Sequence, residues 1–149
     1  MKFITLSQYI ASIFVLSFAL SITPAQAGDN QTSVAGHEKV VFQVSDADPK
    51  KWNLALNNAK NAQEALGAAN VDVEIVVYGP GIAMLKFDST VASRIDEAKD
   101  AGIKVVACEN TMKSQNLTHN DMLSSIGYVP AGVIELMHKQ KEGYAYIRP

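Results

Sequence analysis

The fold is decided by the stretch Lys104-Val105-Val106-Ala107-Cys108-Glu109-Asn110-Thr111-Met112-Lys113-Ser114-Gln115. A short apolar run in it ends at the only cysteine of the chain, and a polar segment typical of a helix start follows at once. Proteins of the α/β class place reactive side chains in this way, at the carboxyl edge of a parallel sheet. The stretch therefore predicts a strand ending next to Cys108 and locates any chemistry of the protein there.

Outside this stretch, β-branched apolar runs alternate with helical patterns. The first helical pattern follows Asp48 and Pro49, an N-cap and the residue favoured at the first helical position, and it stops at Gly67. The repeated strand-helix order predicts a three-layer α/β/α domain with a mainly parallel sheet of about five strands. We expect strands at 39–44, 71–78, 103–107, 127–129 and 144–147, and the main helices at 49–66, 91–101 and 131–141.

The apolar periodicity also predicts which side chains are buried. In the last helix it favours burial of Val133, Ile134 and Met137. In the second strand, Asp72 and Glu74 alternate with valine and isoleucine, which indicates a strand that enters the core from a solvated end.

Short polar motifs mark the remaining boundaries. Residues 88–90 offer caps to the helix that follows them, and the Thr-x-x-Asp arrangement at 118–121 resembles a capping box that opens a short helix through Ser125. Tyr144 and Tyr146 fall on one face of the last strand, which alternates as edge strands do. Because tyrosine is enriched at protein interfaces, this face is expected to serve a subunit contact.

The first residues of the chain have the pattern of an export signal. Lys2 precedes an apolar stretch that is broken by serines, and Pro24-Ala25-Gln26-Ala27 ends in the small-x-small pattern of a cleavage site. We expect a signal peptide at 1–27 with cleavage after Ala27, a flexible segment at 28–38 and the folded domain at 39–149. The protein is then periplasmic or secreted and free of the membrane after cleavage; a retained anchor is the alternative.

Composition argues against several kinds of partner and cofactor. With 13 basic and 15 acidic residues, the chain has a net charge of −2, which does not favour nucleic acid as a partner. Gly79-Pro80-Gly81 lacks the spacing of a nucleotide-binding loop and favours plain turn chemistry. The three histidines lack metal-ligand spacing relative to one another. The sequence therefore predicts neither a cofactor nor a metal.

Several segments together resemble the DsrE/DsrF-like family of sulfur oxidation and sulfur relay proteins. They are 52–58, 76–81, 129–133, 143–147 and above all the Ala-Cys-x-Asn-Thr-Met segment at 107–112. The resemblance implies a Rossmann-like single domain, homo-oligomers such as trimers or hexamers, and a cysteine that carries a persulfide and exchanges sulfur with a donor or acceptor protein. Cys108 stands at the position matching that cysteine.

The thiol of Cys108 has two interpretations. A sulfur carrier needs a thiolate, which a helix start and hydrogen-bond donors stabilise, whereas an inward-turned Glu109 would oppose it. Cys108 is then the catalytic residue of a sulfur carrier or sulfurtransferase. Alternatively, Cys108 is structural and the protein is a non-catalytic homo-oligomeric module that binds a small ligand or a protein. The candidate ligand-binding residues at the same sheet edge are Asp46, Gly79, Pro80, Gly81, Asn110, Thr111 and Met112.

Overall fold

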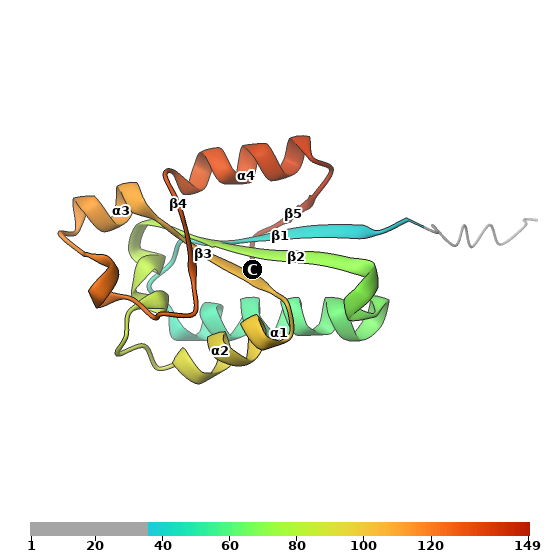
Figure 1. Ribbon diagram of the computed structural model, residues 1–149, viewed down its shortest axis with the longest axis horizontal. Helices are drawn as coiled ribbons and strands as arrows, with labels where there is room; N and C mark the ends of the chain where they lie inside the picture. Colours follow the sequence, from blue (N-terminus) through green and yellow to red (C-terminus); the bar gives the residue numbers. More distant parts are fainter. Residues whose placement is uncertain (1–35) are drawn as a thin grey trace, which may run out of the picture. The chain divides into compact units, whose positions relative to one another are not determined.

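The computed structural model describes residues 36–149 as a five-stranded sheet with helices on both faces (Figure 1). The expected signal peptide at 1–27 and most of the segment at 28–38 lie outside the described residues. Within 36–149, no helix combines the length and the apolar character that crossing a membrane requires.

The sheet confirms the predicted α/β class. All four strand pairings are parallel, and the strand order is β4-β3-β2-β1-β5. The last strand lies at an edge of the sheet beside β1, in agreement with its alternating sequence. The strands are β1 (Glu38–Val44), β2 (Val71–Val77), β3 (Lys104–Cys108), β4 (Gly127–Val129) and β5 (Ala145–Ile147).

The helices divide between the two faces of the sheet. In Figure 1, α1 and α2 lie on one side of the sheet and α4 on the other, while α3 continues from the end of β3 on the α4 side. The described part of the chain also contains three 3-10 segments. The helices are α1 (Pro49–Leu66), α2 (Ala92–Asp100), α3 (Glu109–Ser114) and α4 (Gly132–Lys141), and the turns are η1 (Ala68–Asn70), η2 (Gly79–Leu85) and η3 (His119–Asp121).

Helix α1 begins and ends where the sequence predicts. Asp48 caps it by accepting a hydrogen bond from the amide of Lys50 at 2.9 Å, and Gly67 ends it with a positive φ of 86°. Trp52, facing inward, also donates its indole N–H to the carbonyl of Asp46 at 2.7 Å. The first helix is therefore held to the carboxyl end of β1.

The two faces of the sheet carry unequal cores. The larger apolar cluster lies between the sheet and the α1/α2 layer and includes Phe42, Ile75 and Ile95, all nearly inaccessible to solvent. The smaller cluster lies under α4 and consists of Val41, Val76, Leu136 and Tyr144.

The expected burial in α4 is wrong. Val133, Ile134 and Met137 are 53%, 48% and 48% exposed, and Leu136 is instead the side chain that packs on the sheet. Helix periodicity groups Leu136 with Val133 and Met137, but the packing of α4 turns Leu136 and Lys139 toward the sheet and leaves the other apolar residues on the surface. An apolar stripe therefore lies on the surface of α4.

The expected solvation of Glu74 is also wrong, since this residue is only 3% exposed. It faces α4, where the ammonium of Lys139 lies 3.5 Å from its carboxylate. A cation from a distant helix accounts for a buried carboxylate in a strand whose other buried residues are all apolar.

Two helix starts differ from the predictions. Helix α2 has Val91 at its N-cap. Ser89, two residues earlier, accepts a hydrogen bond from the Val91 amide at 3.3 Å. The capping box at Thr118 forms as predicted but opens only the single turn η3. The chain leaves the helical path at Met122, which pairs with Lys86 in an antiparallel bridge.

Candidate functional site

Cys108 is the last residue of β3 and the N-cap of α3. Its neighbour Ala107 faces the large core, so the alternation along the strand directs the Cys108 side chain to the α4 face. The residue is 5% exposed. Within the described chain, neither of the two apolar clusters includes it, although it is buried.

Polar groups favour the thiolate form of Cys108. Burial by itself raises the pKa of the thiol, but the hydroxyl of Thr111 and the amides of Gly132, Thr111 and Asn110 are directed at the sulfur and more than offset this effect. The pKa of Cys108 therefore lies below that of an ordinary thiol. Within the described residues, the Cys108 side chain makes no capping hydrogen bond at the start of α3.

Thr111 connects the thiol to the loop after β2. Its Oγ1 accepts a hydrogen bond from the amide of Gly79 at 2.9 Å, so its own hydroxyl proton is free to point toward the sulfur. The side chain of Gln115 donates to the carbonyl of Gly79 at 3.4 Å. Helix α3 is thus bound to the Gly79 loop through both backbone groups of one glycine.

Glu109 does not turn toward the thiol. Its carboxylate lies 3.5 Å from Nε2 of His119, and the His119 ring stacks on Tyr128 with 3.9 Å between ring centroids. This arrangement holds the carboxylate on the solvent side of α3, where 47% of the side chain is exposed. The carboxylate that would oppose thiolate formation is thereby kept apart from the sulfur.

The structure brings some of the sequence-predicted site residues together. Asn110 and Thr111 lie beside Cys108, and Gly79 is bound to Thr111. Met112 instead points into the large core and is 3% exposed. Gly81 is buried beneath the end of β1, where an added Cβ would lie 2.7 Å from the carbonyl oxygen of Val44.

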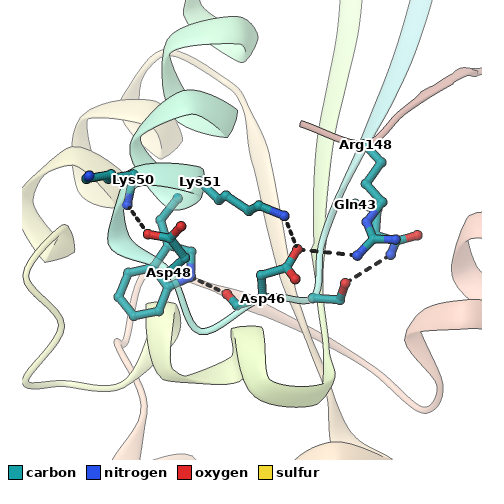
Figure 2. A network of polar contacts seen from close by, with 8 residues as sticks. Gln43, Asp46, Asp48, Lys50, Lys51 and Arg148 are labelled. Carbon is teal, nitrogen blue, oxygen red and sulfur yellow. Dashed lines mark hydrogen bonds and ion pairs between the residues drawn. The ribbon is translucent and has the colours of Figure 1, made fainter.

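The other two candidates lie farther from the sulfur. Pro80 is exposed at the tip of the loop. Asp46 is occupied by cations: Lys51 approaches its Oδ2 at 3.0 Å and Arg148 approaches the same oxygen at 3.3 Å (Figure 2). These two cations hold the pKa of Asp46 below its ordinary value, with the Lys51 hydrogen bond as the main cause.

Sequence reasoning missed two residues next to the thiol, Gly132 and Tyr78. The amide of Gly132 is directed at the sulfur, and the ring of Tyr78 packs against Gly132, where an added Cβ would lie 3.0 Å from its Cδ1. One signal was available. Gly132 closely follows the end of β4, and the carboxyl ends of parallel strands share one edge.

Two hollows lie on the domain away from Cys108. A groove of about 450 Å³ runs beside β5 and is lined by residues that include Phe42, Leu66 and Ile147. Another of about 430 Å³ lies between the starts of β3 and β4. Among residues 36–149, no group of three or more histidine, cysteine or acidic side chains is arranged to hold a metal ion.

Comparison with known proteins shows where this fold recurs. A model of the DsrE/DsrF-like family matches residues 38–149. Among solved structures, the chain is similar to MTH1491 from Methanobacterium thermoautotrophicum, a protein of unknown function. The two share 31% identity with a TM-score of 0.72, over 75% of this chain and 99% of that one.

Two more distant structures have the same fold. BT1422 from Bacteroides thetaiotaomicron, also of unknown function, is 18% identical with a TM-score of 0.56, over 75% of this chain and 95% of that one. The ychN protein from E. coli is 10% identical with a TM-score of 0.61, over 76% and 99%. A search of curated proteins finds no match.

Proposed function

This chain belongs to the DsrE/DsrF-like family, and on that premise we propose that it is a sulfur carrier or sulfurtransferase in which Cys108 accepts a persulfide sulfur. The observation that supports the proposal most directly is the set of donors around the thiol. The lowered pKa of the Cys108 thiol, to which the Thr111 hydroxyl and the amides of Gly132, Thr111 and Asn110 contribute, is a property that a packing cysteine does not require. A nucleophilic thiol needs such donors, because only the thiolate attacks sulfane sulfur.

The proposed step conserves atoms and electrons. The Cys108 thiolate attacks the terminal sulfur of a sulfane donor, a Cys108 S–S bond forms, and the donor's S–S bond breaks with its electron pair leaving on the donor. The product is a persulfide anion on Cys108. The reverse attack by an acceptor thiolate passes the sulfur on and restores Cys108. Thr111, Asn110 and Gly132 stabilise negative charge in both forms.

The experiment offers the reduced protein a sulfane donor and measures its intact mass. We expect a gain of one sulfur atom that a thiol reductant removes and that Cys108→Ser abolishes. Thr111→Val keeps the shape of the side chain but removes the hydroxyl, so it is expected to slow the gain. No gain in mass with several donors would contradict the proposal.

A second function, a non-catalytic binding module, is supported by different observations. Cys108 is only 5% exposed, and α4 presents the apolar stripe Val133, Ile134 and Met137 to solvent. In this case Cys108 is structural and the protein acts by assembling with copies of itself and binding a small ligand or a protein. Alkylation of Cys108 no faster than that of a buried thiol, together with no persulfide, would favour this function.

Self-association is part of both proposals. The family implies trimers or hexamers, and the exposed stripe on α4 is the kind of surface that assembly removes from water. Sedimentation of the domain at tens of micromolar is expected to give an oligomer, and Met137→Glu is expected to weaken it. A monomer for the unsubstituted chain would contradict this expectation.

We propose further that the protein works outside the cytoplasm, after cleavage behind Ala27. The support is the sequence pattern of residues 1–27. Intact mass of the protein from its native host is expected to match a chain beginning at Gly28, and a chain beginning at Met1 would contradict export by this route.

A further inference from the structure

A row of side chains crosses the carboxyl edge of the sheet on the α4 face. Val77 of β2 pairs with Ala107 of β3, so the next residues, Tyr78 and Cys108, lie side by side on adjacent strands. The ring of Tyr78 also packs against Gly132, whose amide is directed at the Cys108 sulfur. Tyr78 is therefore the immediate neighbour of the thiol along this edge.

Two cations lie on the other side of Tyr78. Asp46 follows β1, the strand next to β2, and its Oδ2 contacts both Arg148 at 3.3 Å and Lys51 at 3.0 Å (Figure 2). One carboxylate thus faces two positive charges, which leaves this group with a net charge of about +1. Half of the Arg148 side chain is exposed, so part of its guanidinium is free to bind another anion.

The guanidinium of Arg148 lies at the same edge of the sheet as the Cys108 thiol. Arg148 follows β5, but its contact with Asp46 brings the guanidinium over the end of β1, and roughly two strand spacings, about 10 Å, separate β1 from β3. The pKa of Tyr78 is raised first by burial, and it also responds to Tyr146, Arg148, Asp46 and Cys108. In the strand order, Tyr78 at the end of β2 lies between Cys108 at the end of β3 and the Asp46–Arg148 pair beyond the end of β1.

We propose that Arg148 and Tyr78 form a binding site for a small anion beside Cys108, and that this site selects sulfane donors that carry negative charge, such as thiosulfate. The choice of donor rests on the proposed function, whereas the anion site does not. In the reaction with thiosulfate, the thiolate bonds to the terminal sulfur, and sulfite leaves with the electron pair of the broken S–S bond. The Cys108 thiolate and the thiosulfate dianion repel each other, and the positive charge of Arg148 offsets that repulsion.

The test uses two alkylating agents of nearly the same shape, iodoacetate, which carries a carboxylate, and iodoacetamide, which is neutral. The measured quantity is the ratio of their rate constants with Cys108. We expect Arg148→Gln to lower this ratio about three- to five-fold, as loss of one partly exposed charge would. Arg148→Lys is expected to keep most of the ratio, and Asp46→Asn to raise it.

Lys50→Gln provides the matched control. This variant also removes one positive charge at the start of α1, but Lys50 contacts the network only through its backbone amide, which donates to Asp48 (Figure 2). The ratio is expected to stay unchanged in Lys50→Gln. An equal fall in Lys50→Gln and Arg148→Gln, or no fall in Arg148→Gln, would overturn the anion site.

A second measurement separates this inference from the proposed function. Persulfide formation from thiosulfate is expected to be slower in Arg148→Gln than in the unsubstituted protein, and equal rates would overturn the selection of charged donors. If neither protein gains sulfur while the alkylation ratio still falls in Arg148→Gln, the anion site stands and the sulfur-carrier function fails.

Discussion

The two faces of the sheet differ in what they bury. On the α1/α2 face, the buried side chains are almost all aliphatic or aromatic, and the cluster extends along the sequence from Val40 to Ile126. On the α4 face, a cluster of four buried side chains shares the interface with Glu74, Gln43 and Cys108, all of them at most 9% exposed. One face is an apolar core, and the other mixes apolar contacts with buried polar groups.

The α1/α2 face contributes most of the stability of the fold, and the α4 face contains the groups around Cys108. Apolar burial of the first kind supplies most of the driving force for folding. The thin layer under α4 stabilises less, but it leaves room for amides and hydroxyls to face a sulfur atom, which a dry core would exclude. We therefore expect substitutions on the first face to cause the larger losses in unfolding free energy, and substitutions beside Cys108 on the second face to change the pKa of the thiol.

The largest expected effect comes from the apolar face. Phe42→Ala removes a ring that is 2% exposed, and we expect a loss of about 3 to 5 kcal/mol in unfolding free energy. Leu136→Ala, in the smaller cluster, is expected to cost about 2 kcal/mol. Urea titration of both variants measures the difference. A greater loss for Leu136→Ala would reverse the assignment of the main core.

The next effect concerns the thiol. The pKa of Cys108 is lowered, and Thr111 supplies the strongest of the groups that lower it. We expect Thr111→Val to raise the midpoint of the alkylation rate against pH by about one unit, which corresponds to about 1.4 kcal/mol. Ser114→Ala serves as the control. It also removes a hydroxyl from α3, but that hydroxyl donates to the carbonyl of Thr111 and does not contribute to the pKa of Cys108. Equal midpoints in all three proteins would remove the role of Thr111.

Glu74 tests the electrostatics of the α4 face. Burial raises its pKa, and Lys139 offsets only part of this. The folded chain therefore holds the Glu74 proton more tightly than the unfolded chain, and stability falls as pH rises from the ordinary value of 4.5 through the raised pKa of the folded state. Glu74→Gln is expected to flatten that decline and to add up to about 1 kcal/mol at neutral pH. Urea midpoints at several pH values measure it, and parallel curves for the two proteins would contradict it.

The smallest effect is expected at Glu109. Its carboxylate pairs with His119 at 3.5 Å and is half-exposed. Because solvent screens it from the sulfur, Glu109→Gln should change the alkylation midpoint of Cys108 by less than about 0.3 pH unit. A fall approaching one unit would mean that the carboxylate reaches the thiol in solution.

Local patterns in the sequence determined the elements of the fold. Asp48, Pro49 and Gly67 mark the ends of α1 because a cap, a fixed φ and a positive φ act within a few residues. The same holds for the strand that ends at Cys108, since a β-branched run followed by polar residues favours a strand and then a helix start. Cys108, Asn110 and Thr111 could be assigned to one site because they are close in sequence.

Only the tertiary structure decided which groups from distant segments meet. Distant segments determine the buried stripe of α4, the burial of Glu74 opposite Lys139, and the surroundings of Cys108. These features depend on where α4 and β5 lie on the sheet and on the pairing of β2 with β3, which places Tyr78 beside Cys108. Periodicity gives the faces of an element but not the neighbour that each face meets. Backbone amides leave no pattern in a sequence, so packing alone decides that the amide of Gly132 lies near Cys108.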